Sequence, residues 1–252
     1  MFNTCLNGDS TTWMKTITQP FADMIVADPP FNINYQYDIY VDNLSTDQYL
    51  DWCHGWISEA SRLLLPHGNF LLCMGDEYVS DLDVIARREY GLHRKNWIIW
   101  HYGFGQSGKL NTRKGFTRSK THILRFVKDT KNAYFNAAAV AVPSARATIY
   151  GDSRADPRGK CPNDVFMNKR IAGTHRERVP GIATQMPVEL LQTWIKAMCR
   201  PDGCVFDPFP GSGASLVAAK SLGRSYMGVE LSPQYTEMIL NRPATVPSHN
   251  NT

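Results

Sequence analysis

The sequence predicts an α/β fold, built as a doubly wound, mostly parallel sheet with helices on both faces. Three features indicate it: apolar runs that stop at prolines or glycines, amphipathic helices between these runs, and a late glycine-rich turn between a strand and a helix. Crossover helices place successive strands parallel. The 252 residues suit one such domain, 1–252, with a loop-rich insertion over about 101–182.

The first half of the chain supplies four predicted strands and two predicted helices. Residues 22–27 (ADMIVA) form an apolar run that ends at prolines, as a buried strand does. Residues 46–65 carry apolar side chains at helical spacing, with Ser45 or Thr46 as N-cap and Pro66-His67-Gly68 as the stop. The remaining elements expected here are strands at 69–74, 96–101 and 122–127 and a helix at 76–90.

Regular patterning returns after Pro187. A helix is expected at 188–198 and a strand at 204–206, followed by a glycine-rich turn. A helix at 214–222, which Gly223 ends, and a strand at 225–231 complete the expected elements.

Composition excludes several classes of protein. The chain is 43% hydrophobic and 20% charged, as ordinary soluble proteins are, and its net charge of +4 permits a nucleic-acid partner without requiring one. Six cysteines without CxxC spacing predict reduced thiols and no metal site. No signal peptide or membrane span is evident, so we expect a cytoplasmic protein, associated with the nucleoid in a bacterial host.

The glycine-rich turn, Asp207-Pro208-Phe209-Pro210-Gly211-Ser212-Gly213, predicts a nucleoside cofactor. Small residues between a strand and a helix N-terminus let a ligand approach the backbone closely. Glu230 follows Gly211 by 19 positions, at the end of the next expected strand, where a carboxylate can bind both ribose hydroxyls. The alternative is an ordinary tight turn, with Glu230 on the surface.

Asp28-Pro29-Pro30-Phe31 ends the first apolar strand, at the sheet edge where such folds bind ligands. A carboxylate and a prolyl carbonyl can accept both hydrogens of an aryl amino group, which makes its nitrogen a better nucleophile. Phe31 offers a flat surface on which a flipped base can stack. The alternative is a strand that simply stops at a Pro-Pro turn.

Together these motifs resemble the beta-class amino-group DNA methyltransferases, in the circularly permuted order that places the catalytic motif before the cofactor motif. Asn7-Gly8-Asp9 and Thr184-Gln185-Met186-Pro187 resemble further family motifs. The resemblance implies the Rossmann-like methyltransferase fold, S-adenosylmethionine as cofactor and no metal. It also implies double-stranded DNA as partner, with the target base flipped, and allows a homodimer.

The resemblance assigns roles to individual residues. Met186 departs from the family's usual lysine and Ala214 from its usual threonine, so Ser212 or Ser215 is expected to supply the missing hydroxyl. The catalytic residues would be Asp28, Pro29, Pro30 and Phe31, and the cofactor-binding residues Asp9, Thr184, Gln185, Asp207, Phe209, Gly211, Ser212, Gly213 and Glu230.

Basic residues gather in the expected insertion and suggest contacts with DNA phosphates. Solvated loops would have the same composition. The candidates for nucleic-acid binding are Arg113, Lys114, Arg118 and Lys120 in one group and Arg154, Arg158 and Lys160 in another.

Adenine N6 is the favoured target because Asp28 rather than serine opens the motif. Cytosine N4 is the first alternative, since both reactions use the same chemistry. A nucleic-acid-binding subunit without catalysis is a second alternative, which the departures at Met186 and Ala214 keep open. A methyltransferase acting on RNA or a protein glutamine is a third.

Overall fold

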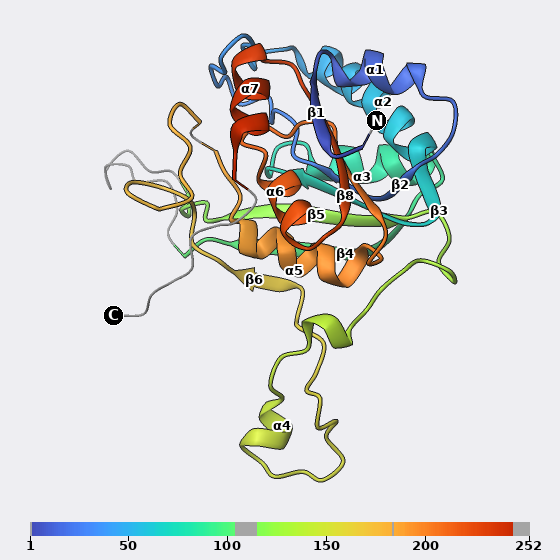
Figure 1. Ribbon diagram of the computed structural model, residues 1–252, viewed down its shortest axis with the longest axis vertical. Helices are drawn as coiled ribbons and strands as arrows, with labels where there is room; N and C mark the ends of the chain where they lie inside the picture. Colours follow the sequence, from blue (N-terminus) through green and yellow to red (C-terminus); the bar gives the residue numbers. More distant parts are fainter. Residues whose placement is uncertain (1, 104–114, 183, 244–252) are drawn as a thin grey trace.

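The computed structural model describes residues 2–103, 115–182 and 184–243. Its eight-stranded sheet has the order β1-β8-β7-β2-β3-β5-β4-β6, and every neighbouring pair is parallel except the two that include β5. This is the mostly parallel α/β architecture that the sequence predicts (Figure 1). The strands are β1 Thr4–Asn7, β2 Ala22–Ala27, β3 Leu64–Met74, β4 His93–His101, β5 Lys120–Val127, β6 Val165–Met167, β7 Cys204–Asp207 and β8 Ser225–Glu230.

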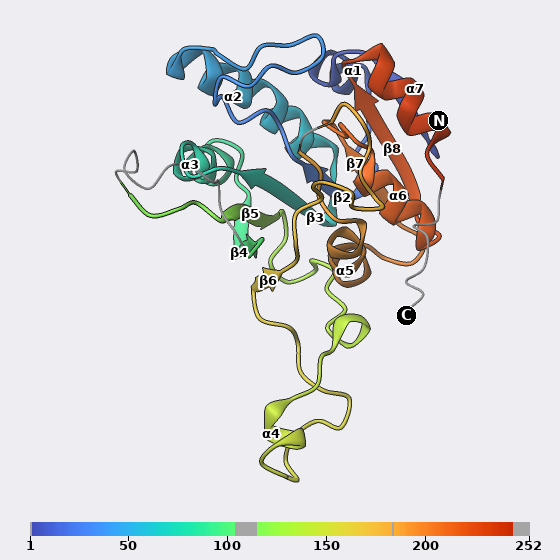
Figure 2. The ribbon, with the colours of Figure 1, turned by 90° about the vertical axis from the view of Figure 1, so that its left-hand side faces the viewer.

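Helices cover both faces of the sheet, and each face has its own core. One core joins the sheet to α1–α3 and includes Trp56 and Phe70; the other joins it to α5 and α6 and includes Trp194 (Figure 2). The helices are α1 Ser10–Thr16, α2 Thr46–Leu63, α3 Val79–Arg88, α4 Ala145–Thr148, α5 Val188–Met198, α6 Ala214–Ser221 and α7 Pro233–Asn241, with a 3-10 turn, η2, at Ala138–Val140.

Local sequence explains most of these elements. All six residues of β2 are buried, as an apolar strand between two helical layers requires. Ser45 caps α2 in a capping box with Gln48. Gly223 adopts a positive φ of 67° directly after the last turn of α6, where it ends that helix as expected.

The predicted end of the 46–65 helix is wrong. The helix stops at Leu63, and β3 begins at Leu64 rather than at residue 69. Pro66 and Gly68 lie in the stretch where the pairing of β3 with β2 shifts register, between Ala22 and Met24. A Cβ at Gly68 would lie 2.9 Å from the Ala22 carbonyl oxygen, so these residues form a bulge within the strand. The strand at 22–27 and the helix at 188–198 have the predicted ends, and the other predicted ends differ by at most three residues.

The segment 101–182 is not one continuous insertion. Two strands, β5 and β6, run through it within the sheet, so its irregular parts are separate loops. The part between β5 and β6 projects from the body as an arm that carries α4 (Figures 1 and 2). A backbone bridge between Val142 and Lys160 closes the neck of this arm. Its role as a target-recognition region stays a prediction.

No helix among the described residues is long and apolar enough to cross a membrane.

Candidate active site

A cavity of about 340 Å³, which we call the edge cavity, lies at the carboxyl edge of the sheet. The ends of β2, β7 and β8 and the residues that follow them form its floor. Five carboxylate residues line it, and none of the described lining residues is Lys, Arg or His. It therefore suits a positively charged ligand. The acidic residues are Asp9, Asp28, Asp38, Asp207 and Glu230.

Asp28 lies directly after β2 and lines this cavity together with Pro29, Pro30 and Phe31. Its carboxyl group accepts no hydrogen bond from the described part of the chain. Desolvation raises the pKa of Asp28 to about 7. A polar acceptor without a partner among the described residues, at the wall of a cavity, is available to a ligand, and a raised pKa is typical of carboxyl groups in functional sites.

The two prolyl carbonyls after Asp28 differ in their partners. The hydroxyl of the fully buried Tyr49 donates to the Pro30 carbonyl oxygen at 2.6 Å. The Pro29 carbonyl has no such partner among the described residues. Tyr49 thus fixes the loop through one carbonyl and leaves the other to accept a hydrogen bond from a ligand.

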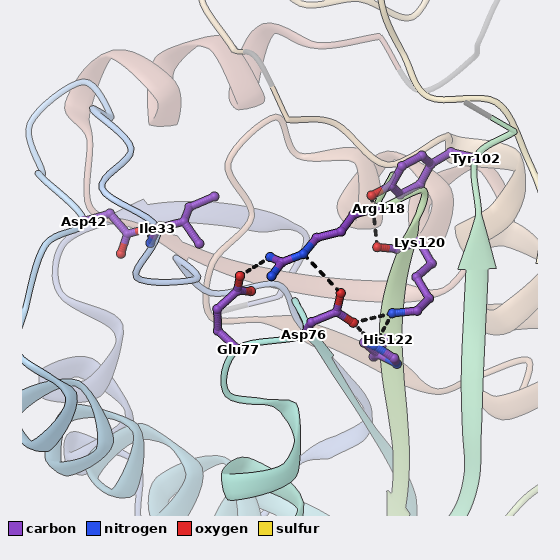
Figure 3. Close-up of polar contacts among 8 residues, drawn as sticks. All are labelled: Ile33, Asp42, Asp76, Glu77, Tyr102, Arg118, Lys120 and His122. Carbon is purple, nitrogen blue, oxygen red and sulfur yellow. Dashed lines mark hydrogen bonds and ion pairs between the residues drawn. The ribbon is translucent and has the colours of Figure 1, made fainter. Parts of the chain in front are cut away.

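Asp42 holds the backbone that follows Phe31. This fully buried carboxylate accepts hydrogen bonds from the backbone N–H of Asn32 at 2.8 Å and of Ile33 at 3.0 Å. Figure 3 shows Asp42 beside Ile33. Asn32 has a φ of 56°, a left-handed conformation that asparagine tolerates better than most residues. The sequence analysis missed Asp42, because its position ten residues after Asn32 matches no motif.

Replacing Asp42 with Ala should slow the reaction that the Asp28 motif is expected to perform by about 100-fold, the effect of misplacing reacting groups by about 1 Å. The affinity for cofactor should stay within about threefold of the parent, because Asp42 does not line the edge cavity. Single-turnover rates and cofactor titration separate the two effects. An equal loss of cofactor affinity would contradict a role confined to the Asn32–Ile33 backbone.

The turn between β7 and α6 forms the opposite wall. Asp207 is buried at the end of β7, accepts from the Phe209 N–H at 2.9 Å and also accepts from the Ser215 hydroxyl. Ser215, one of the two candidates for the hydroxyl that Ala214 lacks, thus bonds to Asp207, and its role toward a cofactor stays a prediction. Burial raises the pKa of Asp207 to about 7.

Glu230 ends β8 and organises two turns at once. Its carboxylate accepts from the N–H of Gly211 at 2.9 Å and from the N–H of Ser232 at 2.9 Å. Burial raises its pKa. These bonds fix the carboxylate at the cavity wall, where its remaining lone pairs can accept from a ligand's hydroxyl groups.

Not every predicted cofactor residue reaches the edge cavity. Asp9, Thr184, Asp207, Phe209, Gly211, Ser212 and Glu230 line it. Gly213 does not: a Cβ there would lie 2.9 Å from Ile239, so this glycine lets α7 pack closely. The buried Gln185 is also off the cavity wall, because its side chain bonds to the backbone of Glu177 and Val179 and braces that loop.

An aromatic wall completes the cavity, and the sequence analysis missed it. Tyr35, Tyr37 and Tyr40 follow the Phe31 loop, and Trp52 and Tyr235 add to them. The alternating tyrosines of residues 34–40 were the available signal. Such rings suit a planar ligand and a cation.

The basic residues form two separate groups rather than one surface. Arg118 pairs with Asp76 and Glu77, and Lys120 with Asp76, beside the end of β3 (Figure 3). Arg154 and Arg158 pair with neighbouring aspartates on the arm, where the Lys160 ammonium donates to Asn163. Arg113 and Lys114 lie outside the described residues.

His122 belongs to the first of these groups. Its Nδ1 accepts from the Trp97 indole at 2.8 Å, so its Nε2 carries the hydrogen that it donates to Asp76 at 2.7 Å. It is a packed histidine that orients Asp76.

A family model described as DNA methylase matches residues 22–241, which include both the Asp28 motif and the glycine-rich turn. The chain belongs to the N6/N4 DNA methylase family. It is therefore an S-adenosylmethionine-dependent DNA methyltransferase that acts on an exocyclic amino group, adenine N6 or cytosine N4.

Curated relatives and solved structures agree with this assignment. The chain is 31% identical to the type II methyltransferase M.HpaI of Haemophilus parainfluenzae, over 91% of this chain and 70% of that protein. It is 32% identical to the DNA adenine methyltransferase YhdJ of Escherichia coli K12, over 95% of this chain and 82% of that protein.

The fold matches two solved methyltransferases. The PvuII cytosine-N4-specific DNA methyltransferase superposes with a TM-score of 0.73 at 18% identity, covering 100% of this chain and 92% of that one. The complex of M1.HpyAVI with S-adenosylmethionine superposes with a TM-score of 0.68 at 21% identity, covering 94% of this chain and 96% of that one. At these identities the likeness concerns the fold alone.

Proposed function

We propose that this methyltransferase transfers the methyl group to N6 of adenine in double-stranded DNA, at a specific site and with the base flipped into the edge cavity. The observation that carries the proposal is a pair of acceptors that no described residue bonds to, the Asp28 carboxylate and the Pro29 carbonyl, in the same cavity wall as the ring of Phe31. Adenine is favoured because Asp28 opens the motif and because a 32% identical relative is named an adenine methyltransferase.

Cytosine N4 remains the second candidate, because the same acceptors would hold the amino group of cytosine. Several relatives are named type II methyltransferases, which supports a role as the modifying enzyme of a restriction–modification system.

The edge cavity fits the cofactor chemically. Carboxylates and tyrosine rings without a lining cation favour a ligand whose sulfonium and ammonium groups are both positive. Glu230 would hold the ribose hydroxyls and Asp9, beside Gly8, the adenine, with the backbone of Gly211 and Ser212 near the methionine end. Thr184 would lie near the cofactor carboxylate. The cofactor supplies a methyl group on a cationic sulfur, open to attack by an amine.

The residues after β2 would perform the other half of the reaction. Asp28 and the Pro29 carbonyl accept the two amino hydrogens, which turns the nitrogen lone pair away from the ring system and toward the methyl donor. Phe31 stacks on the base and limits its motion. Positioning and fixed electrostatics then account for most of the rate enhancement.

We expect kcat/KM for the cofactor to fall as the pH drops below about 7 and to approach tenfold per pH unit. The ionised Asp28 carboxylate only accepts hydrogen bonds, as the amino group of the base requires, whereas the protonated carboxyl group carries a hydrogen of its own. Protonation at low pH therefore removes the reactive form. Bound cofactor, being cationic, should lower the pKa of Asp28, so kcat should fall only at lower pH.

Asp207 has a raised pKa in the same range and is a second source of this pH dependence. Cofactor titration of the Asp28→Asn variant between pH 5 and 9 isolates the Asp207 contribution. A kcat/KM that stays flat between pH 5 and 8 would contradict the ionisation proposed for Asp28.

The decisive test of the function is incubation with unmethylated DNA and labelled S-adenosylmethionine, followed by mass spectrometry of the nucleosides. N6-methyladenine would support the proposal. N4-methylcytosine would mean that the target base is cytosine and would leave the proposed mechanism unchanged. If the DNA stayed unlabelled while RNA in a parallel incubation became labelled, the proposal of a DNA substrate would be wrong.

A further inference from the structure

A second cavity, of about 360 Å³, lies on the α5 face of the sheet at the base of the arm; we call it the arm cavity. It shares no lining residue with the edge cavity. Asn96 of β4 and Arg125 of β5 line it from the sheet, Phe166 from β6 and Trp194 from α5. The segments around it lie side by side in both ribbon views (Figures 1 and 2).

The unusual group in this cavity is the side chain of Arg125. The residue is 7% exposed, and burial lowers the pKa of its guanidinium to about 10. Nε donates to Asn69 Oδ1 at 2.9 Å and Nη1 to Asn96 Oδ1 at 3.1 Å, which leaves Nη2 without a partner among the described residues. Both partners are neutral amides. Arg125 forms no ion pair with a described carboxylate, although Asp164 lines the same cavity.

A buried cation without a counter-charge is costly, and an anion that reaches it is bound strongly. Arg125 is also held rigidly for such contact. Asn69 is fully buried and donates to the backbone carbonyls of Tyr134 and Met198, so it anchors the guanidinium to two other segments. The guanidinium carbon lies 4.6 Å from the centre of the Phe135 ring, which fixes its plane.

The other walls indicate what the anion is attached to. Phe135, Phe166 and Trp194 provide aromatic surface, and the Trp194 indole N–H is buried without an acceptor among the described residues. The volume of the arm cavity is about the same as that of the edge cavity, which fits the nucleoside cofactor. Aromatic walls around a fixed guanidinium suit a planar ring that carries a phosphate or carboxylate.

We propose that the arm cavity binds a small aromatic anion of the nucleoside monophosphate class, with its anionic group on Arg125 and its ring against the aromatic wall. The anion could be a free metabolite or a nucleotide of the DNA substrate, and the chemistry recognised is the same.

Cys161 supplies a direct probe. It lines the arm cavity and is exposed, whereas the other five cysteines are buried. The rate of maleimide labelling of the full-length protein is measured with and without adenosine monophosphate, with S-adenosylhomocysteine saturating the edge cavity. We expect at least fivefold slower labelling with the nucleotide, and little protection by inorganic phosphate alone.

Two substitutions assign the protection to the cavity. Arg125→Met should abolish it, and Thr193→Tyr should abolish it by filling the cavity from α5 without removing the buried cation. Thr193→Ser is the matched control, because serine keeps the hydroxyl that bonds to the Glu189 carbonyl. Each variant is compared with itself, with and without ligand, and its fold is checked through cofactor binding.

Protection by a short DNA duplex but not by the free nucleotide would keep the site and identify DNA as the source of the anion. Unchanged labelling with the nucleotide, phosphate and the duplex would overturn the proposal. Protection that survives in Thr193→Tyr would overturn it as well. None of these readouts uses methylation, so they stand apart from the proposed function.

Discussion

Replacing Asp28 with Ala should reduce methylation by about 1,000-fold or more, while cofactor binding, which loses the attraction of one carboxylate, should weaken far less, by about tenfold at most. The variant loses the acceptor that orients the amino group, whereas Glu230 and the Gly211 turn, which would hold the cofactor, are untouched. Single-turnover methylation and cofactor titration measure the two effects separately. Asp51→Ala, at an exposed position on α2, is a matched control that should keep full activity.

Stability gives an independent check on the same variant. Because the folded-state pKa of Asp28 lies above its unfolded value, the folded protein takes up a proton as the pH falls through about 7. Above that pH the buried charge destabilises the fold. Asp28→Ala should therefore unfold at an equal or higher temperature than the parent at pH 8, and the difference should shrink toward pH 5. A lower melting temperature at pH 8 would mean that Asp28 has a structural role.

Replacing Glu230 with Gln should weaken cofactor binding by about 30-fold, which corresponds to about 2 kcal/mol for hydrogen bonds to a charged acceptor. The amide presents a donor toward the N–H of Gly211 or of Ser232, both of which need an acceptor. It also offers the ribose hydroxyls one acceptor fewer. Calorimetric titration with S-adenosylhomocysteine measures the change directly.

Glu237→Gln on the exposed side of α7 is the control for this experiment, since it removes the same charge outside the edge cavity. It should leave cofactor affinity within about twofold of the parent. An equal loss in both variants would mean that net charge, rather than the carboxylate of Glu230, governs cofactor affinity.

The sequence predicts the fold well where a pattern is local. The all-apolar run of β2 and the amphipathic spacing of α2 depend on neighbours within a few residues, and both elements form as expected. The sequence analysis missed three short elements, β1, β6 and the arm helix α4. Each has three or four residues, which are too few for a periodic signal. The helix end near Pro66 was misplaced because the pairing of β3 with β2, a distant contact, decides it.

The motifs at Asp28 and at Gly211–Glu230 could also be read directly, because each combines a strand end with residues whose chemistry is specific. Their order along the chain determines the permuted family. Tertiary structure alone decides which of their neighbours reach the cavity. Gln185 fits a family motif but braces a loop, and Gly213 accommodates α7.

The sequence by itself thus determined the class of sheet, the two motifs that face each other across its edge and the family of the enzyme. Only the folded chain brings Asp42 beneath the Phe31 loop, distinguishes the Pro29 and Pro30 carbonyls through Tyr49, and buries Arg125 without an ion pair to any carboxylate that the structure describes. The physical reason is that hydrogen bonding and desolvation depend on residues far apart in the chain, and packing in three dimensions decides which of these residues meet.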